Sequence, residues 1–257
     1  MLEGLYAGAL EDSDRRQEST SIADLERLIA DGKPAIDALA AFSPRENVHV
    51  LAEVKRASPS RGDLATIADP AAHARIYESA GATGISVLTE ERKFKGSLDD
   101  LKAVRGAVGV PLLRKDFISN EYQLLEARAA GADIALLIVA GLDQNLLSRL
   151  KTFTEQLGMT AFVETHNRVE LERALEIDSK FVGVNARDLS TFETDRNLFG
   201  ELAHLFPKDV IKVAESAVRN AEDVRHYRSA GADVVLVGEA LVTSDSMATL
   251  KSFLEVK

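Results

Sequence analysis

From residue 48 onward, short hydrophobic runs alternate with amphipathic stretches along the chain. Eight runs rich in aliphatic and β-branched residues are typical of strands, at 48–55, 84–89, 110–115, 133–139, 159–164, 181–185, 210–216 and 233–238. The segments between them, such as 121–130, 169–175 and 221–229, repeat apolar residues at helical spacing. Near-continuous apolar strands joined by helices predict a parallel sheet that is covered by helices.

A repeated Ala-Gly-Ala motif supports this alternation. It places Gly81, Gly131 and Gly231 at the end of a helix and just before a strand, where a left-handed residue commonly ends the helix. Eight such units in roughly 210 residues match the small end of a (β/α)8 barrel. We therefore predict an α/β fold, a (β/α)8 TIM barrel. A doubly wound sheet is the alternative, but no Gly-x-Gly-x-x-Gly motif follows the first strand.

Residues 1–47 are expected to form polar helices that extend the barrel. Apolar side chains recur at helical spacing near the N-terminus, and Ser21 is typical of an N-cap. Pro34 ends the second helix and is expected to begin a third, which runs to Phe42. Because no linker composition separates these helices from the rest, we predict a single barrel domain over residues 1–257, with residues 1–47 packed on it as an N-terminal helical extension.

Composition and charge narrow the class of partner. The formal net charge of −10 argues against nucleic-acid binding, and the absence of cysteine excludes disulfides, thiol nucleophiles and zinc–thiolate sites. The most apolar run, residues 134–142, is far shorter than the roughly 20 residues that span a bilayer. We expect a soluble, cytoplasmic protein with neither a nucleic-acid nor a membrane partner.

Polar side chains stand at the carboxyl ends of five predicted strands. Active sites of (β/α)8 barrels lie at these ends, and side-chain alternation directs the residues toward one mouth. Any one of them is explained equally well as a surface ion pair or a solvated strand end, but the set is not, because Glu and Lys are seldom buried unpaired. The candidate catalytic residues are Glu53, Lys55, Lys115, Glu164, Asn185, Glu215 and Ser216.

This set permits proton transfer without a metal or a cofactor. A lysine among glutamates keeps its charge and can act as a general acid, while a less well paired carboxylate can serve as the base. A Schiff-base lysine remains an open alternative. The five histidines show no ligand spacing, and His166, the one nearest a strand end, is interpreted as a loop residue.

Two further features indicate the substrate class. The loop from Ser58 to Gly62 and the small residues after the last two strands predict a phosphate cradle, and hence a phosphorylated small-molecule substrate. Apolar residues near the same mouth are expected to form a wall for an aromatic group. They are Phe94, Phe117, Leu137, Leu189 and Phe192, although the phenylalanines are explained equally well as packing residues. Leu236 is a further candidate substrate-binding residue.

Five motifs resemble the indole-3-glycerol phosphate synthase family. They are Glu-Val-Lys-Arg-Ala-Ser-Pro-Ser at 53–60, Leu-Arg-Lys-Asp-Phe at 113–117, Val-Glu-Thr-His at 163–166, Val-Asn-Ala-Arg-Asp-Leu at 184–189 and Val-Ala-Glu-Ser at 213–216. The resemblance runs in order from about residue 48 to the end. It implies a carboxy-lyase of tryptophan biosynthesis, which closes the ring of 1-(2-carboxyphenylamino)-1-deoxyribulose 5-phosphate and removes carbon dioxide and water.

The resemblance also implies roles by position. Lys115 is the expected general acid, Glu164 the expected base of the dehydration, and Lys55, paired with Glu53, the expected partner of the substrate carboxylate. The division of the acid role between the two lysines stays open. The remaining implied residues are Asn185, which orients the substrate, Glu215 and Ser216 in the polar shell, Ser58, Gly238 and Glu239 at the phosphate, and Arg187 near the anthranilate.

Two departures and two rival functions accompany this assignment. Ala217 stands where the family usually has glycine, and Arg61 where it usually has lysine. Another phosphosugar isomerase or epimerase is the rival enzyme, although such enzymes usually rely on an Asp or Cys pair or a metal. A catalytically silent scaffold barrel is the other rival. We expect a monomer, and association with other enzymes of the tryptophan pathway stays open.

Overall fold

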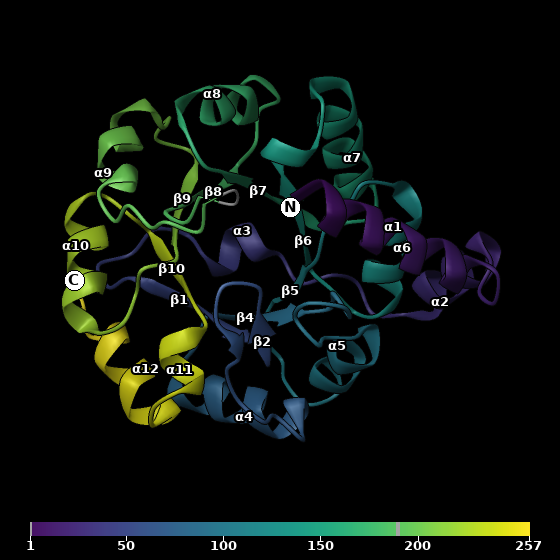
Figure 1. Cartoon of the computed structure of the whole chain (residues 1–257), viewed down its shortest axis with the longest axis horizontal. Coiled ribbons are helices and arrows are strands. Elements are labelled where there is room, and N and C mark those ends of the chain that lie inside the picture. The colour runs from purple at the N-terminus through teal and green to yellow at the C-terminus, as the bar shows by residue number, and fades with distance from the viewer. Residues whose placement is uncertain (1, 189–190) are drawn as a thin grey trace.

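Eight parallel strands close into a barrel, in the order β1-β10-β9-β8-β7-β6-β5-β4 (Figure 1). The computed structural model describes residues 2–188 and 191–257. All eight predicted strands are present, each with ends within two residues of the prediction, which confirms the (β/α)8 barrel. The barrel strands are β1 (His49–Val54), β4 (Gly84–Leu88), β5 (Leu112–Lys115), β6 (Ile134–Ile138), β7 (Thr160–Thr165), β8 (Phe181–Asn185), β9 (Ile211–Glu215) and β10 (Val234–Val237).

Helices cover the outside of this barrel. Gly81, Gly131 and Gly231 have φ values of 102°, 91° and 99°, so each is the left-handed residue predicted after a helix. The helices are α4 (Pro70–Ala80), α5 (Leu98–Arg105), α6 (Glu121–Ala129), α7 (Gln144–Gln156), α8 (Arg168–Glu176), α9 (Leu198–Leu202), α10 (Ala221–Ser229), α11 (Glu239–Val242) and α12 (Ser246–Leu254), with 3-10 turns η1 (Val139–Gly141) and η2 (Ala203–Leu205).

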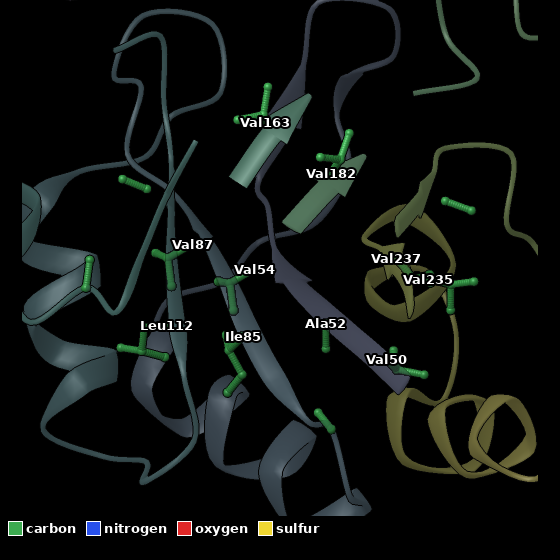
Figure 2. Close-up of a cluster of buried hydrophobic side chains, with 14 of the residues drawn as sticks. Val50, Ala52, Val54, Ile85, Val87, Leu112, Val163, Val182, Val235 and Val237 are labelled. Atoms are coloured by element: carbon green, nitrogen blue, oxygen red, sulfur yellow. The ribbon is translucent and has the colours of Figure 1, made fainter. Parts of the chain in front are cut away.

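Side-chain alternation divides the apolar core into two layers. Val50, Ala52 and Val54 of β1 belong to the layer between the strands and the helices, part of which is shown in Figure 2. Leu51 on the same strand belongs to a second cluster, which fills the barrel together with residues such as Phe162. Glu53, two residues after Leu51 on the same inner face, therefore lies at the carboxyl end of the barrel, which we call its mouth.

The N-terminal extension contains α1 (Leu2–Gln17), α2 (Ile22–Asp31) and α3 (Ala38–Ala41). The expected helix from Pro34 to Phe42 is wrong, because only its last part is helical. The Asp37 side chain accepts a hydrogen bond from the backbone N–H of Ala40 and so caps α3, while the N–H of Ile36 donates to the buried Asp133. Both bonds hold the backbone before Ala38 outside the helix.

The extension reaches both ends of the barrel. Phe42, just after α3, is fully buried and packs on Phe181 near the start of β8, and Figure 1 shows α3 in the centre of the ring of strands. At the opposite end, α1 passes across α6 and places Leu5 at the mouth. A short hairpin, β2 (Ala57–Ser58) and β3 (Gly62–Asp63), follows β1. Among the described residues, no helix has the length and apolarity needed to cross a membrane.

Candidate active site

A cavity of about 420 Å³ lies at the carboxyl ends of the strands. Its lining contains every predicted catalytic residue, so the strand-end polar residues do converge on one mouth. Of the predicted substrate-binding residues it contains Ser58, Phe94, Phe117, Arg187, Leu236, Gly238 and Glu239.

Lys115 is the centre of the site. Its Nζ lies 2.7 Å from Oε2 of Glu164 and 3.0 Å from Oε2 of Glu215. Burial alone would favour a neutral lysine, but the two carboxylates raise the pKa of Lys115 above its ordinary value. The lysine is therefore charged, as a proton donor must be, and this argues against the Schiff-base alternative. Lys55 forms a second pair, with Nζ 2.5 Å from Oε2 of Glu53.

The two carboxylates beside Lys115 differ in protonation. Burial opposes the charge of Glu164, but Lys115 and His166 hold the pKa of Glu164 well below its ordinary value. Burial and the negative charge of Glu164 raise the pKa of Glu215 to about 8. Near neutral pH, Glu164 is an ionised carboxylate and Glu215 retains its proton. One acceptor and one proton-bearing group thus flank the same cation.

Asn185 orients this cluster. Its Nδ2 donates to Oε1 of Glu164 at 3.0 Å, and its Oδ1 accepts from Oγ of Ser216 at 2.8 Å and from the N–H of Arg187 at 3.0 Å. Arg187 in turn donates from Nη1 to Oγ of Ser60 at 3.3 Å. The ends of β7, β8 and β9 are therefore joined side chain to side chain.

Two glycines make room for the carboxylates. A Cβ on Gly183 would collide with Oε1 of Glu215 and with the ring of Phe162, and one on Gly238 would collide with the carboxylate of Glu53. Gly238 is a predicted phosphate-site residue, whereas Gly183 is not among the predicted site residues. A glycine on the inner face of a strand is itself a signal of close approach, and it was available in the sequence.

The apolar wall differs in part from the prediction. The prediction that Leu137 lines the cavity was wrong, because its side chain lies in the layer between strands and helices. Leu136 and Ile138, its neighbours on β6, line the cavity instead. Leu189 lies outside the described residues. Phe94 and Phe117 pack together, with ring centroids 6.1 Å apart. Phe192 also lines the cavity.

The N-terminal helix α1 contributes to this wall, which the sequence pattern did not indicate. Leu5 lines the cavity, and the ring of Tyr6 packs edge-on against Phe117 at 5.6 Å. The Tyr6 hydroxyl donates to the carbonyl of Ile138 at 3.3 Å, and Gly141 leaves space for the tyrosine ring. These contacts join segments more than 100 residues apart, so local spacing carries no trace of them.

The residues predicted to bind a phosphate also lie at the mouth, in the segments that follow β1, β9 and β10. Ser58, Ser216, Ala217, Gly238 and Glu239 all line the cavity. Ser216 and Ala217 both have left-handed backbones, with φ of 67° and 54°. This explains why glycine is the easier residue at position 217. The carboxylate of Glu239 lies 3.1 Å from Arg61, so the ion pair partly neutralises a negative group beside the predicted cradle.

A closed (β/α)8 barrel with a charged lysine between two buried glutamates, at a cavity that has aromatic residues in its lining, defines a class of enzyme. It is one that can move protons on a small molecule at the carboxyl ends of the strands. Comparison with known proteins is more specific. The family model described as "Indole-3-glycerol phosphate synthase" matches residues 2–253. The chain belongs to the indole-3-glycerol phosphate synthase family, which confirms the predicted resemblance and, with it, a carboxy-lyase of tryptophan biosynthesis.

Curated relatives carry the same name. The chain is 61% identical to the indole-3-glycerol phosphate synthase of Leifsonia xyli subsp. xyli, over 98% of this chain and 97% of that protein. It is 55% identical to the one from a Parafrankia species, over 94% and 90%, and 52% identical to that of Mycobacterium avium, over 95% and 89%. A solved structure described as "Native KDPGal structure" superposes with a TM-score of 0.58 at 15% identity, covering 80% of this chain and 92% of that one. That similarity shows the fold alone.

Proposed function

We propose that Lys115 is the general acid and Glu164 the base of the family's reaction in this chain. The charged Nζ of Lys115 protonates the ribulosyl carbonyl oxygen while the aromatic carbon that bears the carboxylate attacks the carbonyl carbon. Loss of carbon dioxide returns its bonding electrons to the ring. Lys115, reprotonated from solvent, then protonates the hydroxyl group, which leaves as water while Glu164 removes a proton from the adjacent methylene carbon. The observation that supports this most directly is the contact of Lys115 with an ionised Glu164 at 2.7 Å.

The cavity offers a place for each part of the substrate. The phosphate is bound by Ser58 and by the backbone at Gly238 and Glu239, and the anthranilate ring lies against Phe94 and Phe117. Lys55 binds the substrate carboxylate, with Arg187 on the same side. Anchoring both ends holds the attacking carbon near the carbonyl carbon, so that binding energy offsets part of the entropic cost of reaching the transition state.

The two lysines are assigned different tasks because their partners differ. Lys115 contacts two carboxylates, one on β7 and one on β9, whereas Lys55 pairs with Glu53, two residues before it along the chain. The assignment to amino-acid biosynthesis supports action in the cytoplasm.

The proposal is tested by fluorescence detection of indole-3-glycerol phosphate formation from the carboxyphenylamino-deoxyribulose phosphate. Wild type should turn over with a metal chelator present. Lys115→Met should lose about 10²-fold or more in kcat, as expected when a general acid is removed. Lys55→Met should instead raise KM more than it lowers kcat. The reverse pattern would assign the acid role to Lys55, and a folded wild type without turnover would overturn the proposal.

A further inference from the structure

His166 is a buried side chain beside the proposed base, and no role was predicted for it. It follows the end of β7, two residues after Glu164, and its side chain is only 9% exposed. Nε2 of the imidazole lies 3.2 Å from Oε1 of Glu164. Nδ1 lies 3.0 Å from Oε2 of Glu170, in the first turn of α8. The ring is therefore held between two carboxylates rather than lying free in a loop.

This geometry favours a protonated ring. An ionised carboxylate oxygen only accepts hydrogen bonds, so Nδ1, which is hydrogen-bonded to Oε2 of Glu170 at 3.0 Å, carries a proton. Nε2 lies within ion-pair distance of Oε1 of Glu164, at 3.2 Å, although it makes no hydrogen bond with the described residues, and the two negative charges together favour the imidazolium. Burial opposes that charge, but Glu164 and Glu170 outweigh it and raise the pKa of His166 to about 10.

Glu170 keeps the imidazole in place. Its Oε2 also accepts the backbone N–H of His166 at 2.8 Å, and its Oε1 accepts from Nδ2 of Asn167 at 2.8 Å. Asn167 is in turn the N-cap of α8. The start of the helix thus fixes the ring, and the ring's other nitrogen faces the active site.

We propose that His166 is a positioning residue that holds the carboxylate of Glu164 ionised and correctly oriented as the base, an inference that rests on the proposed function of Glu164. Lys115 occupies Oε2 of Glu164, while Asn185 and His166 approach Oε1. When Lys115 gives its proton to the substrate, its stabilisation of Glu164 falls away. The imidazolium then remains as the cation beside that carboxylate.

Other titratable groups also face this pair and must be considered in any pH profile. Tyr6 of α1 stays neutral and adds no charge, because burial and the negative charge of Glu164 raise the pKa of its hydroxyl above the ordinary value. Among the described residues these groups are Lys115 on β5, Glu215 on β9, Glu170 on α8 and Tyr6 on α1, with Glu53 at the end of β1 and the neighbouring Lys55 beyond Lys115. Lys115 remains when His166 is replaced, so the expected effect is a shift of the profile rather than its loss.

The test is the pH profile of kcat for His166→Gln. Loss of the cation should move the acidic limb to higher pH by about one unit, which gives about a tenfold lower kcat on that limb. The deficit should shrink above the limb, with KM unchanged within about twofold. Glu170→Gln, which retains an acceptor oxygen, should shift the limb less in the same direction. His204→Gln, exposed on η2, is the matched control and should leave the profile unchanged.

Three outcomes separate the possibilities. A kcat that falls equally at every pH, or an unshifted limb, rejects the positioning role. If His166→Gln does not fold, Glu170→Gln decides, because an unshifted limb in that variant also rejects the role. Glu164→Gln tests the base itself: full activity there overturns the proposed function, whereas an inactive Glu164→Gln beside an unshifted His166→Gln overturns only this inference.

Discussion

Two glutamates flank one lysine at the centre of the site, and their surroundings give them different protonation states. Glu164 accepts hydrogen bonds from Lys115 and Asn185 and lies within ion-pair distance of His166, so its negative charge is compensated despite burial. Glu215 contacts Lys115 through Oε2 only, and its buried Oε1 has no hydrogen-bond partner within the described residues. An incompletely satisfied, desolvated carboxyl group retains its proton.

This difference predicts how stability depends on pH. The folded protein keeps the Glu215 proton to about pH 8, whereas an unfolded glutamate, with a pKa near 4.5, loses it earlier. Between these values the unfolded state binds fewer protons, so this group makes wild-type stability fall as pH rises. Glu215→Gln has no proton to lose. Its Tm relative to wild type should therefore be higher at pH 9 than at pH 6, by about 2 °C or more.

A matched control isolates this effect. Glu26→Gln removes an exposed carboxylate on α2 and should leave the difference in Tm unchanged between the two pH values. An equally flat difference for Glu215→Gln would show that Glu215 is ionised throughout the range.

Backbone strain at Ala217 leads to a second prediction at this scale. An alanine with φ of 54° carries a steric cost that glycine avoids, although glycine is more flexible in the unfolded chain. We expect Ala217→Gly to stabilise the protein by up to about 1 kcal/mol, which raises Tm by about 2–4 °C. Ala103→Gly, in an exposed interior position of α5, should change Tm in the opposite direction. Equal losses of Tm in both variants would contradict the argument.

Residue spacing predicted most of the site, and its failures have physical causes. Glu53, Lys55, Lys115, Glu164 and Glu215 stand out because a charge at the end of an apolar strand breaks the alternation. Leu137 could not be assigned in this way, because β6 is apolar on both faces and alternation carries no information there. His166 required knowledge that Glu170, one helical turn further on, folds back onto it.

At the scale of elements, α1 is tied to the loop that carries Phe94. The buried Asp12 accepts hydrogen bonds from Nε and Nη2 of Arg92, at 2.9 and 2.8 Å. The carboxylate of Glu90 accepts the backbone N–H groups of the next residues, including Phe94 at 2.8 Å. The helix therefore determines where this part of the aromatic wall stands.

Asp12→Asn should loosen that wall without unfolding the barrel. The amide retains one acceptor but loses the charge, and because solvent screens the exposed Arg92 we expect only a modest effect on substrate binding. KM should rise by about fivefold, with kcat within twofold. Asp14→Asn, exposed on the same helix, is the control. Steady-state kinetics of both variants check the prediction, and an unchanged KM for Asp12→Asn would refute it.

The elements themselves were predictable to different degrees. Barrel strands and their helices repeat a pattern eight times, so each unit supports the others. The third N-terminal helix had no such support: Pro34 is compatible with a helix start, but the Asp37 cap and the bond from Ile36 to Asp133 moved the start to Ala38. The last of these contacts spans 97 residues and is invisible to local reasoning.

Across the whole molecule, the barrel has a closed end and an open end, and each carries a phenylalanine. Phe42 is fully buried at the amino ends of the strands, against Phe181 and close to Gly84. Phe94 is half-buried at the mouth, where it contacts Phe117. The first belongs to the continuous core beneath the site. The second borders the cavity, where substrate is proposed to bind.

Replacing phenylalanine by alanine should therefore affect mainly stability at the closed end and mainly substrate binding at the mouth. Phe42→Ala leaves a cavity in a packed core and should lower the free energy of unfolding by about 3–5 kcal/mol. Tm should then fall by about 6 °C or more, while KM stays within twofold. Phe94→Ala should raise KM several-fold with Tm nearly unchanged. Thermal unfolding and steady-state kinetics of both variants measure this. Phe42 joins the extension to the barrel, so the same variant also tests whether residues 1–257 form a single domain. If they do, Phe42→Ala should still unfold in one transition. Separate transitions for extension and barrel would show that the two fold independently.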